Sequence, residues 1–427
     1  MTENFISESA YLADLEKRGQ LPRGFRTASV PLLFLPSERP QGGEQKMMLS
    51  MILMDEPSDS FAGVFTSNRF PGSPVIVGKE RMDAPHTRGV IINNRIANVC
   101  SPTGIEDIER LLSALSKSTG GDVHDYFSSS TGIIGWQLPV DKMISALPDL
   151  LSGLNRDSAL KLAKGIMTTD SFPKIRSIQV GGGRIVAVAK GAGMIEPNMG
   201  TMLCFIMTDL DVSRFELRGL LPGVAERTFN RVSVDGDQST SDMVLVFSSK
   251  KAGKVDLEEF RIALEGVMGA LAEDIVRNGE GTAHVIKVNL TGASDDKSAG
   301  LLARAVVNSP LVKTAVAGND PNVGRIISSL GDCAGNLDLP LDPRRVSVSL
   351  GGTLLFKESK FMLDAEREEK MSAYLKSAEL NSELKAYPEH SRTVDIDIDL
   401  GLGGGVSSVF GSDLTHEYVS ENADYRT

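Results

Sequence analysis

The sequence predicts a layered fold of mixed strands and helices, either α+β or α/β. Short apolar runs rich in β-forming residues and bounded by turn residues predict strands, and amphipathic runs between them predict helices. The length of 427 residues predicts two or three domains, or two lobes that share a core. The sequence shows no fixed-period repeat or low-complexity linker that would mark a domain boundary. Such a pattern is typical of sheets covered by helices.

The predicted strands and helices alternate along most of the chain. Strands are expected at residues 46–54, 89–100, 184–190, 201–210, 242–249 and 284–290. Helices are expected after Thr103, from Asp256, and over residues 300–317 and 363–380. The helix from Asp256 is the clearest, because its apolar positions recur along one face and Asp256 with Glu259 resembles a capping box. These apolar positions are Phe260, Leu264, Val267, Leu271 and Ile275.

Composition and charge narrow the class of function. A net charge of −11 without a basic stripe disfavours a nucleic-acid surface, because phosphate binding needs clustered Lys and Arg. No apolar run reaches the roughly 18 residues of a membrane span, so no membrane partner is expected. The first residues include acids and lack an apolar signal core, and the cysteines are few: Cys100, Cys204 and Cys333. We therefore expect a cytoplasmic protein that acts on small molecules.

Several common site motifs are weak or missing. Asp395, Asp397 and Asp399 share one face of a predicted strand and could bind a hard cation, but a solvated strand edge is the more frequent arrangement. The glycines that follow lack dinucleotide-loop spacing, and the five histidines lack H-E-x-x-H or Cys/His spacing. No G-x-S-x-G elbow anchors a conventional triad.

Three polar loops are stronger candidates. They cover residues 128–135, 164–174 and 230–242. The first contains Thr131 and Gly132 in a turn of the kind whose backbone N–H groups face an anion. A single polar loop of this kind is more often a surface loop than a functional site. The presence of three such loops favours a functional site more strongly than any one of them does.

Thr201 is the candidate nucleophile. In GAGMIEPNMGTMLCF it follows Gly200 and begins an apolar run. If the chain is cut before Thr201, its own α-amine becomes the base that a hydroxyl nucleophile needs, with a pKa of about 7.7–8.0. Gly200 permits the unusual backbone conformation that such a cut requires. A threonine that simply begins a strand is the alternative, and this segment alone favours it.

Taken together, the segments resemble the ornithine acetyltransferase family, the bifunctional glutamate N-acetyltransferases of cyclic arginine biosynthesis. The likeness covers nearly the whole chain and rests on many matches in order. They include NRIANVCSPTG (94–104), STGIIGWQLP (130–139), GIMTTDSFPK (165–174), KGAGMIEPNMGTML (190–203), FNRVSVDGDQSTSD (229–242), SPLVKTAVAGNDPNVGR (309–325) and DLTHEYVSENADYRT (413–427).

The resemblance implies an α+β fold with two lobes in an αββα-type sandwich. It implies self-cleavage between Gly200 and Thr201, which gives an α chain of residues 1–200 with the oxyanion hole and a β chain of residues 201–427 with the C-terminal lobe. Matched motif by motif, the oxyanion hole falls on Thr131 and Gly132. The substrate-binding positions fall on Thr168, Thr169, Lys190, Thr201, Glu280, Asn422 and Thr427.

The implied reaction is ping-pong transfer of acetyl from N²-acetylornithine to glutamate through an acyl-enzyme on Thr201. The family needs neither a metal nor an organic cofactor, and some members accept acetyl-CoA as the donor. The α and β chains stay associated, so a heterotetramer of two α and two β chains, or a larger assembly, is expected. An amidase or aminopeptidase that uses the same Thr201 is the alternative, and a binding protein that forms no acyl-enzyme is a third.

The chain departs from the family pattern at a few positions. Gly200 stands where the family usually has Ala, and Val323 stands where Trp is frequent. Residues 69–75 lack the usual Ala-Ala, and residues 282–284 read Thr-Ala-His in place of Ala-Thr-Lys. Because this last stretch adjoins Glu280, the departures bear on the donor and acceptor more than on the chemistry. They suit a paralogue of specialised metabolism as well as an enzyme of the arginine pathway.

Overall fold

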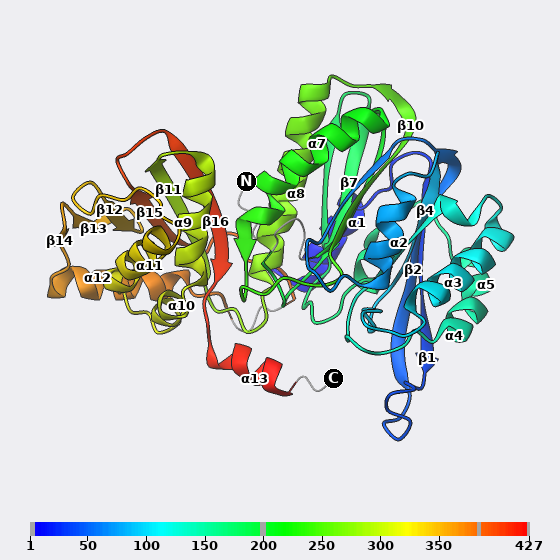
Figure 1. The fold of residues 1–427 in the computed structure, drawn as a ribbon, viewed down its shortest axis with the longest axis horizontal. Helices are drawn as coiled ribbons and strands as arrows, with labels where there is room; N and C mark the ends of the chain where they lie inside the picture. Colours follow the sequence, from blue (N-terminus) through cyan, green and yellow to red (C-terminus); the bar gives the residue numbers. More distant parts are fainter. Residues whose placement is uncertain (1–4, 197–201, 382–385, 425–427) are drawn as a thin grey trace.

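The computed structural model describes residues 5–196, 202–381 and 386–424, and the chain forms two lobes (Figure 1). The larger lobe contains two sheets with helices α1–α8, and the smaller lobe contains the third sheet with helices α9–α12. The predicted α+β class with two lobes is confirmed. Gly200, Thr201 and Thr427 lie outside the described residues.

The first sheet of the larger lobe has the strand order β1-β2-β4-β5. Its strands are β1 (Phe25–Phe34), β2 (Gln45–Ser58), β4 (Thr87–Asn93) and β5 (Tyr126–Ser130). Their outer face packs on helices, and the apolar residues between them form one core cluster. The helices of this layer are α3 (Gly104–Thr119), α4 (Val140–Ser145) and α5 (Leu147–Ser152), with α2 (Ser73–Arg81) beside them.

The second sheet has the order β3-β10-β8-β7-β6. Its strands are β3 (Phe61–Phe65), β10 (Met243–Lys254), β8 (Leu203–Asp211), β7 (Gly183–Lys190) and β6 (Lys174–Val180). Helices α7 (Arg214–Arg227) and α8 (Leu257–Arg277) cover its outer face. A separate core fills the space between the two sheets, with Phe127 of β5 against Phe247 of β10. Four layers result, so the predicted αββα sandwich is confirmed in this lobe.

Two further helices close the ends of the larger lobe. They are α1 (Glu8–Arg18) and α6 (Leu160–Gly165), whose buried residues join the core between the sheets. Helix α8 follows the predicted pattern, because Phe260, Leu264 and the other positions of the predicted face are buried. The Asp256 carboxylate accepts hydrogen bonds from the N–H groups of Glu258 and Glu259, which confirms the predicted start of this helix.

The smaller lobe is built on a sheet with the order β14-β13-β12-β15-β11-β16-β9. The strands are β9 (Val232–Ser233), β11 (Val285–Ala293), β12 (Ser347–Leu350), β13 (Thr353–Lys357), β14 (Lys360–Phe361), β15 (Val394–Asp399) and β16 (Gly405–Ser412). One core lies between this sheet and its helices. The helices are α9 (Asp296–Asn308), α10 (Pro310–Ala317), α11 (Val323–Asn336) and α12 (Ala365–Ala378).

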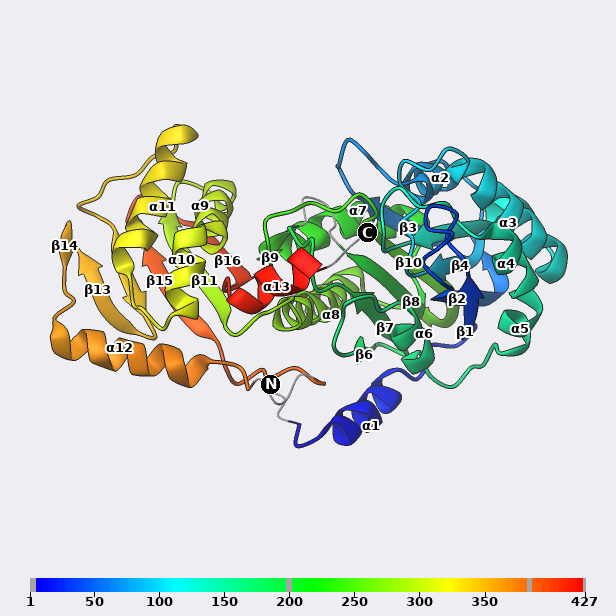
Figure 2. The same ribbon diagram turned by 90° about the horizontal axis from the view of Figure 1, so that it is seen from below.

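Two elements connect the lobes. The short strand β9 follows α7 in the chain but pairs with β16, so a segment of the larger lobe completes the sheet of the smaller one. Helix α13 (His416–Asp424) leaves β16 and lies in the region between the lobes (Figures 1 and 2). The C-terminal helix is therefore returned toward the larger lobe, where the predicted site residues are.

Three sequence predictions about the elements were wrong in detail. Strand β4 ends at Asn93 rather than at residue 100, because Arg95, Asn98 and Cys100 have positive φ angles that a strand does not allow. Residues 300–317 form parts of two helices, because Pro310 starts α10 and Ser309 caps it. The strand with the three aspartates, β15, is interior rather than an edge, and only its aspartate face meets solvent.

The predicted division after residue 200 falls within the second sheet. Strand β7 ends at Lys190 and its antiparallel neighbour β8 begins at Leu203. Strand β8 is followed in the sheet by β10, and β10 by β3, which comes from the first part of the chain. The proposed α and β chains would therefore both contribute strands to one sheet.

Candidate active site

A cavity of about 160 Å³ lies in the larger lobe beside the start of β8. Met202 and Leu203, which follow Thr201 in the sequence, line it. Every predicted site residue within the described chain lines it as well: Thr131, Gly132, Thr168, Thr169, Lys190, Glu280 and Asn422. The predicted roles of Gly200, Thr201 and Thr427, which lie outside the described residues, stay predictions.

Thr131 and Gly132 form a tight corner directly after β5. The N–H of Thr131 donates to the carbonyl of Asn93 over 3.1 Å. The N–H of Ile133 donates to the carbonyl of Arg95 over 2.9 Å. Gly132 has a φ of 126°, and a Cβ there would lie 2.3 Å from the Arg95 carbonyl carbon, so glycine is required. No described residue accepts a hydrogen bond from the Gly132 N–H.

Two adjacent asparagines fix the walls of the cavity. The Oδ1 of Asn93 accepts a hydrogen bond from Ser130 Oγ over 2.7 Å, directly before the Thr131 corner. The Nδ2 of Asn94 donates to the carbonyl of Met167 over 2.8 Å, at the start of the 167–170 loop. Sequence reasoning missed this function of both residues. The available signal was an amide pair at the end of a buried strand, where such side chains bind backbone groups.

A buried ion pair organises the loop that carries Thr168. Lys174 Nζ lies 2.6 Å from Asp170 Oδ1 and donates a second hydrogen bond to Asn278 Oδ1 over 2.5 Å. The Asp170 carboxylate also accepts from the N–H of Thr168 (3.1 Å) and the N–H of Gly191 (2.8 Å). A single carboxylate thus ties the threonine loop to the residue that follows Lys190.

The charges in this wall depend on each other. Burial opposes ionisation of Asp170, but the positive charges of Lys174 and Lys190 outweigh it and hold the pKa of the carboxyl at about 2. Burial lowers the pKa of Lys174, and the Asp170 carboxylate opposes that effect. The two groups are fully buried and in contact, so each depends on the charge of the other.

Lys190 supplies the positive charge at the mouth of the wall. It ends β7, and its Nζ donates to Thr168 Oγ1 over 3.3 Å. Its side chain is only half-buried, in contrast to Lys174, so it is accessible from the cavity. An ammonium group beside a hydroxyl is a suitable receptor for a carboxylate.

Glu280 and Asn422 form the opposite side of the cavity. The Nδ2 of Asn422, in α13, donates to Glu280 Oε2 over 3.0 Å. The N–H of Glu280 donates to the carbonyl of Ala192 over 3.0 Å. A Cβ at Gly193 would lie 2.3 Å from the Glu280 carboxylate, so glycine allows the close approach. These contacts bring the C-terminal helix to the segment that precedes the predicted cleavage position.

Asp242 also lines the cavity, and sequence reasoning did not single it out. The N–H of the next residue, Met243, donates to the carbonyl of Met202 over 3.0 Å, so Asp242 lies beside the start of β8. Asp242 is 2% exposed, and its Oδ2 has no hydrogen-bond partner in the described chain. Burial raises the pKa of this carboxyl well above its usual range, although Lys190 opposes the effect. The signal in the sequence was an acid between a polar loop and an apolar strand.

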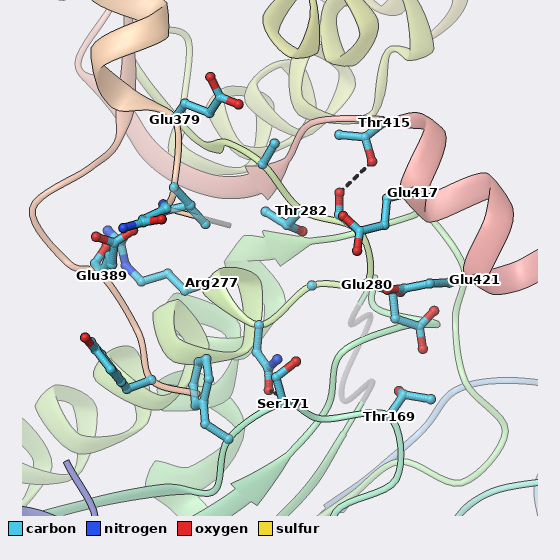
Figure 3. A pocket seen from close by; sticks show the side chains of 18 residues that line it. Thr169, Ser171, Arg277, Glu280, Thr282, Glu379, Glu389, Thr415, Glu417 and Glu421 are labelled. Atoms are coloured by element: carbon cyan, nitrogen blue, oxygen red, sulfur yellow. Dashed lines mark hydrogen bonds between the residues drawn. The ribbon is translucent and has the colours of Figure 1, made fainter. Parts of the chain in front are cut away.

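A second cavity, of about 260 Å³, adjoins the first between the lobes. Thr169 and Glu280 line both cavities. Figure 3 shows carboxylates around this space, from the segment after α12 and from α13. The acidic residues of its lining are Glu280, Glu379, Glu389, Glu417 and Glu421. The hydroxyl of Thr415 donates to the carbonyl of Gly281 over 2.6 Å and holds the start of α13 against this wall.

Residues 282–284, which depart from the family pattern, do not all face the second cavity. Thr282 and Ala283 line the second cavity, whereas His284 is fully buried behind it. The Nδ1 of His284 lies 2.7 Å from Asp413 Oδ2, and its Nε2 lies 3.2 Å from the carbonyl of Leu375. His284 therefore contacts the segment before α13 and helix α12, and it does not face either cavity.

In the described part of the chain, no three His, Cys, Asp or Glu side chains are grouped so that they could hold a metal ion. No helix among the same residues has both the length and the apolar composition to cross a membrane.

The sequence is similar to known proteins along most of its length. The sequence profile of the ArgJ family matches residues 40–427. The chain is 38% identical over 417 residues to the "Arginine biosynthesis bifunctional protein ArgJ" of Nitratidesulfovibrio vulgaris, which covers 95% of this chain and 99% of the relative. It is 36% identical over 409 residues to the "Glutamate N-acetyltransferase Oat2" of Streptomyces clavuligerus, covering 95% and 98%.

A solved structure is similar over part of the chain. The crystal structure of the arginine biosynthesis bifunctional protein ArgJ from Bacillus halodurans shares 36% sequence identity and covers 52% of this chain and 98% of its own, with a TM-score of 0.46. The profile match over most of the sequence and the relatives above 30% identity along nearly their whole length agree with the motifs. The protein belongs to the ArgJ family.

Proposed function

We propose that this protein is a self-processing N-terminal-threonine acyltransferase that moves acetyl from N²-acetylornithine to glutamate. The observation that carries the proposal is the cavity that gathers the predicted site residues beside Met202. The names of the relatives, an arginine-biosynthesis bifunctional protein and a glutamate N-acetyltransferase, support the same activity. The family's place in arginine biosynthesis is the proposed pathway, with a paralogue of specialised metabolism as the alternative setting.

Processing creates the catalyst in this proposal. The Thr201 hydroxyl attacks the carbonyl carbon of Gly200, and the peptide C–N bond breaks to give an ester and a free α-amine. Water then hydrolyses the ester, which leaves a carboxylate on Gly200 and restores the hydroxyl. Thr201 now carries both a nucleophile and the adjacent amine that accepts its proton. Residues 1–200 and 201–427 become the α and β chains.

Acetyl transfer then proceeds in two half-reactions. The Thr201 hydroxyl attacks the acetyl carbonyl of N²-acetylornithine while its proton passes through the α-amine to the leaving nitrogen of ornithine. The product is an acetyl ester on Thr201. The amine of glutamate attacks this ester, its proton returns to the threonine oxygen, and N-acetylglutamate leaves. The Gly132 N–H and the Thr131 hydroxyl stabilise the oxyanion in both steps, because the Thr131 N–H already binds the carbonyl of Asn93.

Each part of the cavity wall has a role in substrate binding in this proposal. Lys190 with Thr168 binds the α-carboxylate that ornithine and glutamate share. Thr169, Glu280 and Asn422 border the path from this point to the second cavity. The carboxylates around the second cavity favour a substrate with an ammonium side chain, which supports an ornithine-type donor.

Intact mass under denaturing conditions tests the processing step. The purified protein is expected to give two fragments whose masses add up to that of the 45.8 kDa chain plus one water. Thr201→Ala is expected to give one chain without transfer, whereas Thr353→Ala, in β13 of the smaller lobe, serves as the matched control. An active protein with a single uncut chain would refute the proposal.

The acceptor distinguishes transfer from hydrolysis. With acetylornithine and glutamate together, most of the acetyl is expected on glutamate, and an acetyl adduct is expected on the fragment that begins at Thr201. Release of the acetyl to water at equal speed with and without glutamate would favour the amidase. Acetyl-CoA in place of acetylornithine tests that donor.

We further propose that two αβ units assemble, which light scattering tests as twice the mass of the 45.8 kDa chain.

A further inference from the structure

The segment that leads to the predicted cleavage position is held by a dense set of hydrogen bonds. The N–H of Gly191 donates to Asp170, and the carbonyl of Ala192 accepts from Glu280. Farther along, the contacts pass to the loop that follows β9. Nearly every residue from Gly191 to Glu196 is thus tied to another part of the lobe.

Asp235 is the centre of these contacts. Its Oδ2 accepts from the N–H of Met194 over 2.6 Å, and its Oδ1 accepts from the N–H of Ile195 over 2.8 Å. Oδ1 also accepts from the N–H of Asp237 over 3.3 Å. One carboxylate therefore fixes two consecutive peptide groups of the segment and the turn of its own loop. Met194 has a φ of 55°, so the backbone held in this way is not an ordinary extended strand.

The backbone around Asp235 continues the clamp. The N–H of Val234 donates to the carbonyl of Ile195 over 2.7 Å, and the N–H of Glu196 donates to the carbonyl of Asp237 over 3.0 Å. The Ile195 side chain is buried in the core below the second sheet. The Glu196 carboxylate accepts from Asn308 Nδ2 over 2.5 Å. The segment is fixed in both position and direction at Glu196, four residues before Gly200.

The structure assigns Asp235 as a positioning residue for self-cleavage. The assignment rests on the proposed function, because it concerns the processing step of the same site. An attack within one chain is fast only when the two reacting groups are held in register, and a displacement of about 1 Å costs on the order of a hundredfold in rate. Asp235 holds the N–H groups of Met194 and Ile195, which belong to the described segment that leads toward the predicted cleavage position. Asp235 lines neither cavity, and its side chain also forms a hydrogen bond with Tyr418 of α13.

Asp235→Asn tests the assignment with almost no change in shape. A carboxylate accepts hydrogen bonds on both oxygens, whereas an amide turns an NH2 group toward one of the two N–H donors. Asp237→Asn is the matched control, because its side chain is exposed and only its backbone carbonyl binds the segment. Cell-free synthesis followed by a chase measures the half-time for conversion of the full-length chain to two fragments. Asp235→Asn is expected to lengthen this half-time by about tenfold or more, and Asp237→Asn to leave it within about twofold.

Hydroxylamine and thermal melting separate positioning from general damage. Hydroxylamine cleaves esters and not ordinary peptide bonds, so it does not restore the speed of Asp235→Asn if formation of the ester is the impaired step. Full restoration by hydroxylamine would overturn the assignment, as would a large fall in Tm of the uncut variant relative to Asp237→Asn. Equal half-times for wild type and Asp235→Asn would overturn it as well. A wild-type chain that is never cut would instead refute the proposed function.

Discussion

Lys174 and Asp170 form a fully buried ion pair, 2.6 Å from Nζ to Oδ1, directly behind the wall that carries Thr168 and Lys190. Because the same carboxylate binds the N–H groups of Thr168 and Gly191, the pair fixes two segments of the cavity together. This buried pair does not itself line the cavity, and it positions Thr168 at the cavity wall and Gly191 next to Lys190.

Removal of one partner of this pair is expected to be costly. Asp170→Asn leaves the Lys174 charge buried without its partner, so the free energy of unfolding should fall by about 3–5 kcal/mol. The matched control is Asp141→Asn, which breaks the exposed pair with Arg110 (2.6 Å) and should cost about 1 kcal/mol or less. Urea denaturation at pH 7 measures both. A loss from Asp170→Asn no larger than that from the control would contradict the prediction.

The same pair predicts a loss of stability in acid. The folded pKa of Asp170 is about 2, below the value of about 3.9 in an unfolded chain, so the carboxylate stabilises the fold above the unfolded value. This contribution is lost as the pH falls from about 4 toward 2. Unfolding curves of the wild type and Asp170→Asn should converge over this range. Curves that stay parallel would show that the pKa shift is absent.

Asp242 has the opposite pH dependence. Its folded pKa is raised by burial, so the carboxyl opposes folding most strongly above the folded pKa; this cost shrinks as the pH falls from the folded pKa toward the unfolded value of about 3.9, and it is absent below that value. Asp242→Asn removes the charge and should raise the free energy of unfolding at pH 8, with a gain that shrinks at lower pH. Urea titrations at pH 8 and at lower pH values measure this gain in the free energy of unfolding. Asp237→Asn, at an exposed position of the same loop, should show no such gain.

Lys190 is expected to act on substrate binding more than on folding. Lys190→Gln removes the charge beside Thr168 and should raise KM for the amino-acid substrates by about tenfold or more, which corresponds to a charge-assisted hydrogen bond of about 1.5–3 kcal/mol. The control is Lys164→Gln, at an exposed position of α6. Initial rates of acetyl transfer over a range of substrate concentrations give KM and kcat. An unchanged KM would remove Lys190 from the carboxylate subsite.

The sequence predicted the parts of the fold in which local pattern and tertiary contacts agree. Helix α8 has strong apolar periodicity and strand β10 begins with a continuous apolar run, and both start within one residue of the predicted position, although β10 continues beyond residue 249 to Lys254. The break at Ser309 and Pro310 was missed because both flanking segments are apolar enough for one long helix. The interior position of β15 was missed because its neighbours β11 and β12 are distant in the chain and their pairing leaves no local mark.

The candidate site was predicted to a similar degree. The family motifs placed Thr131, Lys190 and Asn422 in one site, and the structure brings these residues to one cavity. The supporting contacts were not predictable, because they join segments by chemistry that has no fixed spacing. Asn278, for example, binds Lys174 from the end of α8, and only the fold makes these two residues neighbours.

The order β3-β10-β8-β7-β6 has a consequence for the fate of the cut protein. Strands β8 and β10 come from the chain after residue 200, and they lie between β3 on one side and β7 with β6 on the other. The two central strands of the sheet would therefore belong to one product of cleavage and the three outer strands to the other, and separation would require rupture of two ladders together with the cores on both faces. The two fragments would stay associated, and they could not exchange between molecules without unfolding. Cleavage would therefore break one peptide bond and leave the arrangement of strands in this sheet unchanged.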